Sequence, residues 1–335
     1  MSAFSADVPI MIVIVTVAQD LHALAVQERV RGLGWPDCHI VECDRIAQRS
    51  CLTYSIGYSA PDSVLTSEGQ AIRVSEAKVL WLRTIRSTQI LQHPVEDENA
   101  AALVNNDCRG ALLGLLATHF HGRWISTPEA TLRGSDKLVQ LNAARQGGFR
   151  IPRTLVSQSR KDVLDFYEAC RGEVIVKTII GAPGPLLETK RLEPERFDDA
   201  SFAAAPAIYQ EYIKGADHLR LNCFGAHSYA ARICTEDLDW RANLNVPITS
   251  YTVPPALHDR VRSVLDLLRL EMGVVDLKLT PQGEPVWFEV NPQGQFLFLD
   301  ALTDLGLAEK FATYLIAEAR KAEAQDVAST PRLSR

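Results

Sequence analysis

The sequence predicts a protein of mixed helices and strands, in the α/β (α+β) class. Residues 9–17 form a continuous apolar run rich in β-branched residues, which is typical of a strand buried in a parallel sheet. A helical pattern and a second short strand follow, and helices and strands alternate again after residue 124. Residues 271–300 then contain two strand patterns joined by a turn. With 335 residues, the chain is long enough for two or three modest domains.

The composition is that of a soluble globular protein, with 47% hydrophobic and 23% charged residues. The net charge of −6 argues against a general nucleic-acid-binding protein. The longest apolar run, residues 8–18, is too short to cross a bilayer and follows no basic segment, so we expect neither a signal peptide nor a membrane anchor. The seven cysteines are scattered without a Cys-x-x-Cys pair, which indicates reduced thiols and a cytoplasmic location.

The first third of the chain predicts a strand, a helix and further strands. Asp20 can cap a helix that ends at residues 34–36, Gly-Trp-Pro, and residues 39–43 form a second short strand. No Gly-x-Gly-x-x-Gly motif follows the first strand, so we expect no dinucleotide site here. Residues 78–83, Lys-Val-Leu-Trp-Leu-Arg, form another strand that ends in a basic cluster with Arg86.

A domain boundary is expected near residues 124–129. Beyond it, Ser135 can cap a helix that two glycines end. After a further strand and helix, residues 173–180 give a strong strand pattern, and residues 181–185, Gly-Ala-Pro-Gly-Pro, form a loop. The prolines of this loop reduce the number of N–H groups that could bind a phosphate. Judged by the residues alone, Lys177 is a surface lysine at a strand end.

Residues 271–300 contain a candidate metal site. Glu289 and Asn291 are two residues apart, so they share a face of an extended strand, and hairpin pairing can bring Asp276 opposite them. Two carboxylates and an amide oxygen form an all-oxygen site, which suits Mg²⁺ carrying nucleotide phosphates. The alternative is the polar face of an exposed hairpin. Apolar neighbours such as Trp287 and Phe288 argue against it, because acidic groups in such surroundings need a partner.

This hairpin also carries a family resemblance. Gly-Val-Val-Asp-Leu-Lys-Leu-Thr-Pro-x-Gly-Glu, followed by Phe-Glu-Val-Asn-Pro-x-Gly-Gln-Phe-Leu-Phe, resembles the C-terminal magnesium motif of ATP-grasp ligases. Among these ligases it is most similar to the graspetide (microviridin-type) maturases, which cross-link ribosomally made peptides. Val-Leu-Trp-Leu-Arg at residues 79–83 and Asp-Trp-Arg at residues 239–241 also match that pattern. The resemblance is strong from Lys137 to Phe298 and looser before.

The resemblance implies an ATP-grasp fold preceded by an N-terminal α/β pre-ATP-grasp domain. The expected boundaries are residues 1–126 for the N-terminal domain and 127–206 for the small ATP-grasp subdomain. Residues 207–322 would form the large subdomain with the magnesium site, and residues 323–335 a polar tail.

The resemblance also implies a nucleotide site. Lys137 and Lys177 would hold the phosphates of ATP. Residues 207–214 match the hinge that seats the nucleotide, where the backbones of Glu211 and Ile213 would meet adenine and Asp217 would face the ribose. Two Mg²⁺ ions are expected, with Mn²⁺ as an alternative. The full expected set is Lys137, Lys177, Gln210, Glu211, Tyr212, Ile213 and Asp217 for the nucleotide, and Asp276, Glu289 and Asn291 for the metal.

The family chemistry runs through an acyl phosphate. A substrate carboxylate attacks the γ-phosphate, and a hydroxyl or amine then attacks the acyl phosphate, releasing ADP and phosphate. Arg232 is the candidate for the transferring phosphoryl group and Arg241 for the substrate carboxylate, because a guanidinium can bind either in a bidentate manner. Arg220 lies on the same predicted hairpin as Arg232, and the turn at residues 225–226 leaves open whether they share a face.

The predicted function is therefore ATP-dependent activation of an Asp or Glu side chain in a precursor peptide, followed by ester or amide cross-linking. One alternative is an ATP-grasp ligase that joins an amino acid to a small acid or a peptide terminus. Another is a non-catalytic protein that binds ATP and a partner. The intact set of Asp276, Glu289 and Asn291 argues against this second alternative. The expected partner is a leader-bearing precursor peptide, with neither nucleic acid nor membrane, and the resemblance allows a homodimer.

Overall fold

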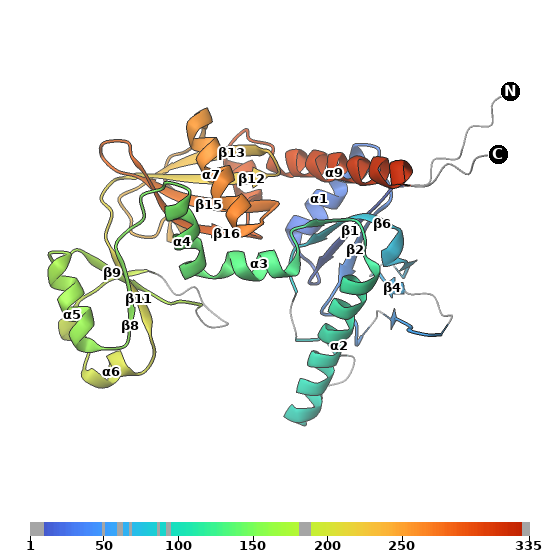
Figure 1. Ribbon diagram of the computed structural model, residues 1–335, viewed down its shortest axis with the longest axis horizontal. Coiled ribbons are helices and arrows are strands. Elements are labelled where there is room, and N and C mark those ends of the chain that lie inside the picture. Colours follow the sequence, from blue (N-terminus) through green and yellow to red (C-terminus); the bar gives the residue numbers. More distant parts are fainter. Residues whose placement is uncertain are drawn as a thin grey trace. The chain divides into compact units, whose positions relative to one another are not determined.

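The computed structural model describes residues 10–48, 51–58, 63–66, 69–85, 88–91, 95–180 and 189–329. The chain forms two compact units, each with its own core (Figure 1). Unit 1 comprises Met1–Pro128, Gln295–Asp300 and Gly306–Arg335, and unit 2 comprises Glu129–Gly294 and Ala301–Leu305. The predicted loop at residues 181–185 and Arg86 lie outside the described residues.

Unit 1 is built on a parallel sheet with the strand order β2-β1-β6-β7. Its central strand β1 is buried at all six positions, as its unbroken apolar sequence predicts. A small antiparallel sheet, β3-β4-β5, and a 3₁₀ turn, η1 (Val74–Glu76), lie in the same unit. The strands are β1 (Met11–Thr16), β2 (Cys38–Glu42), β3 (Leu52–Thr53), β4 (Ser63–Leu65), β5 (Ala71–Ile72), β6 (Ala77–Leu82) and β7 (Arg123–Ile125).

Helices α1 (Leu21–Gly32), α2 (Glu98–His119) and α9 (Leu307–Ser329) belong to unit 1. Asp20 caps α1 as predicted, accepting a hydrogen bond of 2.9 Å from the His22 N–H. Helix α9 packs against α1 and the parallel sheet, where Phe311 meets Trp81 edge-on at 4.6 Å. The helix continues through Ser329, into the segment expected to be a polar tail.

Helix α8 (Leu297–Leu302) begins with a side-chain cap from a distant part of unit 1. The Nε2 of His22 accepts hydrogen bonds from the N–H groups of Phe296 and Leu297, at 3.0 and 3.3 Å. Burial lowers the pKa of His22 to about 4, which keeps the ring neutral and able to accept. The cap fixes the chain that directly follows the predicted metal hairpin.

The first sheet of unit 2 is antiparallel, with the order β10-β9-β11-β8. Helix α4 is capped by Asp136, which accepts from the N–H groups of Leu138 and Val139, whereas Ser135 ends the preceding helix and donates to the carbonyl of Thr131. The elements are α3 (Pro128–Ser135), α4 (Lys137–Gln146), β8 (Thr154–Ser157), α5 (Arg160–Ala169), β9 (Val174–Lys177), β10 (Lys190–Arg191), η2 (Pro194–Arg196), α6 (Asp199–Ala203) and β11 (Ala207–Glu211).

The second sheet of unit 2 is also antiparallel, with the order β14-β13-β12-β15-β16. One face packs against helices α4 and α7 through an apolar core that includes Leu219, Leu277 and Trp287. The other face carries polar side chains. The elements are β12 (Asp217–Phe224), β13 (His227–Cys234), η3 (Trp240–Ala242), β14 (Ile248–Tyr251), α7 (Pro255–Leu268), β15 (Met272–Leu279) and β16 (Pro285–Asn291).

A buried glutamine ties helix α4 to strand β16. The Nε2 of Gln140 donates to the carbonyls of Gly134 and Val290, at 2.6 and 2.8 Å. Its Oε1 accepts from the Val290 N–H at 2.9 Å. Gln140 thereby satisfies three buried backbone groups and holds the start of α4 beside the end of β16.

Among the residues that the structure describes, no helix is both long and apolar enough to cross a membrane.

Candidate active site

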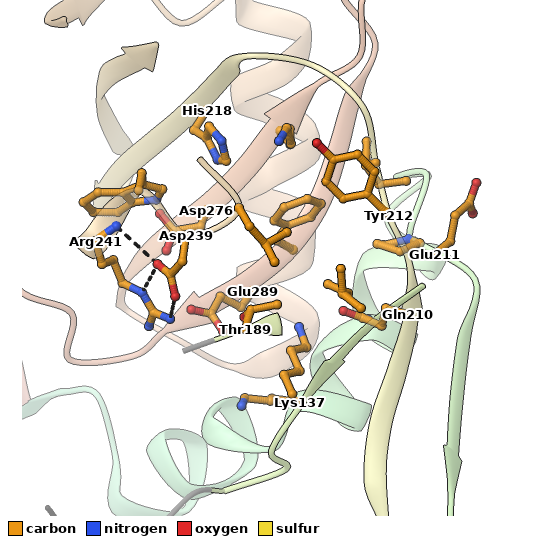
Figure 2. A pocket seen from close by; sticks show the side chains of 18 of the residues that line it. Lys137, Thr189, Gln210, Glu211, Tyr212, His218, Asp239, Arg241, Asp276 and Glu289 are labelled. Atoms are coloured by element: carbon orange, nitrogen blue, oxygen red, sulfur yellow. Dashed lines mark hydrogen bonds and ion pairs between the residues drawn. The ribbon is translucent and has the colours of Figure 1, made fainter. Parts of the chain in front are cut away.

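A cavity of about 340 Å³ opens on the polar face of the second sheet of unit 2 (Figure 2). Strands of both unit 2 sheets and the 3₁₀ turn η3 contribute its walls. It is lined by Lys137, Pro152, Ile175, Lys177, Thr178, Ile180, Thr189, Gln210, Glu211, Tyr212, Ile213, His218, Leu238, Asp239, Trp240, Arg241, Asp276, Lys278, Phe288 and Glu289.

Two carboxylates lie next to each other in one wall of this cavity. Asp276 on β15 is paired in register with Glu289 on β16. Immediately beyond this pair the register shifts, because β16 has one additional residue, Phe288, before Trp287 pairs with Leu277. This bulge puts Trp287 in the core and leaves Glu289 on the cavity side, although the two residues would share a face of a regular strand.

Arg220 contacts Asp276 from the neighbouring strand β12. One guanidinium nitrogen, Nη1, donates to both carboxylate oxygens, at 2.8 and 2.9 Å. Burial raises the pKa of Asp276, and the opposing Glu289 carboxylate adds to this increase, whereas Arg220 counteracts it. A further cation bound beside the two carboxylates would therefore stabilise their charged forms.

The donor set fits magnesium bound to phosphates. Among the described residues, no group of three or more His, Cys, Asp or Glu side chains comes together as a metal site. Asp276 and Glu289 instead offer two carboxylates, and Mg²⁺ in phosphoryl-transfer sites is commonly held by one or two carboxylates, water and the substrate's phosphates. Asn291 is paired with Val274 on the same sheet face, but it is exposed and its Oδ1 accepts from the Gln293 N–H at 3.0 Å.

Two lysines from different elements reach the same cavity. Lys137 begins helix α4 and donates to the carbonyl of Thr178 at 2.8 Å, and Lys177 ends strand β9. Burial lowers the pKa of both, that of Lys177 to about 8, with Glu289 opposing the decrease in each. The positive charge of Lys137 also lowers the pKa of Lys177. Such a pair of partly buried cations favours an anionic ligand.

The segment directly after β11 lines the cavity with both bonded and unbonded backbone groups. The N–H groups of Glu211 and Tyr212 are bonded to the carbonyls of Arg153 and Glu173. Among the described residues, no hydrogen bond from the Ile213 N–H is found, although Ile213 is buried. Gln210 donates from its side chain to the Thr154 hydroxyl at 2.9 Å.

Arg241 lines the cavity as one half of a bidentate pair. Its Nε and Nη2 donate to the two carboxylate oxygens of Asp239, at 2.7 and 2.6 Å (Figure 2). These hydrogen bonds raise the pKa of Arg241 further above its usual range. Burial opposes ionisation of Asp239, but the bonds from Arg241 outweigh it and lower the pKa of that carboxyl. The pair is thus ionised and fixed in orientation.

Arg232 and Asp217 do not reach this cavity. They form a bidentate pair with each other at 2.7 and 2.8 Å, on the sheet face that also carries Leu219. The physical reason is the two-residue turn between β12 and β13, which pairs Phe224 with His227. Such a turn places residues of even separation on opposite faces, so Arg220 and Arg232 cannot face the same side. This geometry corrects the expected position of Arg232.

Sequence reasoning did not single out His218 and Lys278 as site residues. They are cross-strand partners on β12 and β15, and both line the cavity. Strand periodicity contains the signal that could have found them, because His218 lies two residues before Arg220 and Lys278 two residues after Asp276.

The fold is that of the ATP-grasp ligases. No protein-family model and no curated protein matches the chain. Solved structures do: the macrocyclase MdnC bound with precursor peptide MdnA, from Microcystis aeruginosa MRC, has a TM-score of 0.80 at 21% identity, covering 92% of this chain and 99% of that one. The Chryseobacterium gregarium RiPP-associated ATP-grasp ligase, in complex with ADP and a leader and core peptide, has a TM-score of 0.79 at 21% identity, covering 92% and 97%.

A third similar structure is the ATP-grasp ligase PsnB complexed with a phosphomimetic variant of a minimal precursor, Mg and ADP. Its TM-score is 0.75 at 22% identity, covering 93% of this chain and 99% of that one. These likenesses confirm the predicted fold, and they do so over nearly the whole chain.

Proposed function

We propose that the protein is an ATP-dependent carboxylate ligase that acts on a ribosomally made precursor peptide. It would activate an Asp or Glu side chain as an acyl phosphate and form an ester or amide cross-link, releasing ADP and phosphate. One observation carries the proposal. A single cavity joins the Asp276–Glu289 carboxylate pair, the cations Lys137 and Lys177, and the oriented guanidinium of Arg241. Solved proteins similar in fold hold ADP, Mg and precursor peptides.

The nucleotide would lie between the hinge and the carboxylate pair. In this proposal the Glu211 carbonyl and the Ile213 N–H meet the adenine edge, and Lys137 and Lys177 contact the phosphates. Asp276 and Glu289 would hold Mg²⁺, with Asn291 as a third oxygen donor on the same face. Bound Mg²⁺ neutralises phosphate charge, which lets a carboxylate approach the γ-phosphate.

The chain's own arginines would position the reactants. Arg241 is placed to bind the substrate carboxylate through its guanidinium, and Asp239 holds that guanidinium in one orientation. Arg220 acts through Asp276, since it fixes the position of that carboxylate and favours its charged form. It is therefore a positioning residue.

Finer features extend the same proposal. We propose that the two ATP-grasp subdomains divide near residue 206 and that the site takes two Mg²⁺ ions, which Mn²⁺ can replace. The substrate would carry a leader segment. The enzyme would work in the cytoplasm, and a homodimer is the proposed assembly.

The test uses a synthetic leader-bearing peptide whose core holds Asp or Glu together with Ser, Thr or Lys. With ATP and Mg²⁺ we expect ADP release that requires the peptide, and loss of one water per cross-link by mass spectrometry. ADP release that requires a free amino acid instead would favour the small-molecule ligase. ATP binding without turnover in either case would favour a non-catalytic protein.

A further inference from the structure

Two buried nitrogen-bearing side chains in the cavity wall have no assigned role. His218 and Lys278 are paired directly across β12 and β15, and they are 5% and 2% exposed. The Nε2 of His218 is buried without a hydrogen-bond partner. Within the described part of the chain, the ammonium of Lys278 also makes no hydrogen bond, and it lies 5.5 Å from the centre of the Tyr212 ring. Buried polar groups in native proteins are nearly always paired, so the unpartnered Nε2 of His218 indicates a ligand, and Lys278 lines the same part of the cavity beside it.

The position of the pair along the sheet identifies the part of the ligand that it meets. It lies one same-face step from Asp276 and Glu289, which is about 7 Å along a strand. The step leads from the carboxylate pair toward the hinge at Tyr212, as the ring contact of Lys278 shows. In the proposed nucleotide site, the group between the metal-bound phosphates and the base is the sugar.

The chemistry of the pair matches a vicinal diol. An ammonium group only donates hydrogen bonds, whereas a neutral imidazole has one donor and one acceptor nitrogen, and each sugar hydroxyl can do both. Asp217, the acidic residue expected at the ribose, lies on the opposite sheet face and is paired with Arg232. At the expected position of the ribose, the cavity wall therefore carries His218 and Lys278 in place of an acidic residue.

We propose that His218 and Lys278 bind the 2′- and 3′-hydroxyls of the nucleotide's ribose and so select ribonucleotides over deoxyribonucleotides. This inference rests on the proposed ATP-binding function of the same cavity. It assigns sugar recognition to an amine and an imidazole, and it leaves the metal to Asp276 and Glu289.

Binding titrations with Mg²⁺ and ATP, 2′-deoxy-ATP or 3′-deoxy-ATP test the proposal without requiring turnover. The wild-type protein should bind at least one deoxy form about tenfold more weakly or worse, since that form loses a hydrogen bond to a charged or buried partner. Lys278→Met keeps the length of the side chain and removes its donors. This variant should bind ATP about tenfold more weakly and discriminate little between ATP and the affected deoxy form.

Two further variants complete the test. His218→Phe should reduce discrimination at one of the two hydroxyls, with folding checked by thermal unfolding. Lys161→Met is the matched control, because Lys161 is exposed on helix α5, does not line the cavity and pairs with Asp165 at 2.7 Å. It should leave the ratio of affinities unchanged. Loss of a buried ammonium should not destabilise the Lys278→Met protein.

The outcomes distinguish a failure of the proposed ribose recognition from a failure of the proposed ATP-dependent function. If Lys278→Met weakens ATP and both deoxy forms equally, Lys278 contacts the phosphates or the base and the inference is overturned. Equal wild-type affinity for all three nucleotides also overturns it, while leaving nucleotide binding intact. If the wild-type protein binds none of them, the proposed ATP-dependent function fails as well.

Discussion

Asp276 and Glu289 lie directly opposite each other on β15 and β16, because a one-residue bulge at Phe288 turns Glu289 toward the cavity. Bulges of this kind re-aim side chains at functional sites. Here the bulge lets Trp287 fill the core while the carboxylate two residues later faces a ligand.

Glu289→Gln should remove turnover without unfolding the protein. The substitution keeps the shape of the side chain and removes one charge from the proposed metal site, so we expect the rate of ADP release to fall by about 10²-fold or more. Stability without metal should not fall, because two like charges no longer oppose each other. The measurement is peptide-dependent ADP release alongside thermal unfolding.

The control for this variant is Glu284→Gln, on the approach to the same strand. Glu284 is exposed and pairs with Arg150 at 3.0 Å, so its loss should change neither rate nor stability by much. A Glu289→Gln protein with a near-normal rate would show that the metal is bound elsewhere.

Lys177 should couple nucleotide binding to proton uptake. Its pKa is lowered to about 8 in the ligand-free protein, and a bound polyphosphate should raise it again. Between these two pKa values the complex holds a proton that the free protein lacks. Affinity should therefore be full below pH 8 and decrease above it, by at most about tenfold per pH unit. Phosphate groups have a pKa of about 6, so their own titration does not cause this decrease.

Calorimetry in buffers of different ionisation enthalpy measures the uptake directly. Lys177→Arg keeps a positive charge throughout this range, so it should flatten the pH dependence while retaining binding. An unchanged slope in that variant would assign the proton to another group.

Gln140 should be a large contributor to stability. Gln140→Leu leaves the carbonyls of Gly134 and Val290 and the N–H of Val290 without their partner, so we expect a loss of about 2–5 kcal/mol in the free energy of unfolding. Urea titration measures it. Asn142→Ala, at an exposed position of the same helix, should change stability by less than about 0.5 kcal/mol. Similar effects of both substitutions would contradict this role for Gln140.

The strands of the site were predictable from local pattern. Alternation and the turn after Leu279 predicted β15 and β16, and the unbroken apolar run predicted β1. The bulge at Phe288 was not predictable in this way, since it depends on how Trp287 packs in the core. The face of Arg232 could have been deduced, because a two-residue turn fixes the parity of a hairpin.

The convergence of the two lysines is of another kind. Lys137 and Lys177 come from a helix and a strand of unrelated local sequence, and no periodicity relates them. Only the family resemblance connected them. In the structure Lys137 donates to the carbonyl of Thr178, the residue that directly follows Lys177. The non-local packing that brings such residues together is not encoded in any short window of sequence.

Arg241→Lys should separate substrate positioning from nucleotide binding. Lysine keeps the charge but cannot make the two parallel hydrogen bonds that Arg241 now makes with Asp239, and it cannot grip a substrate carboxylate with a fixed fork. If the guanidinium orients the peptide carboxylate, the rate of peptide modification should fall by about 10–100-fold while ATP affinity changes by less than about threefold.

Asp239→Asn should act in the same direction as Arg241→Lys, since it releases the Arg241 guanidinium from its fixed orientation. Arg232→Lys is the matched control, because Arg232 makes an equally bidentate pair with Asp217 on the opposite sheet face. Equal losses of rate and ATP affinity in Arg241→Lys would place this residue on the nucleotide, and no loss in either would make it a structural partner of Asp239 alone.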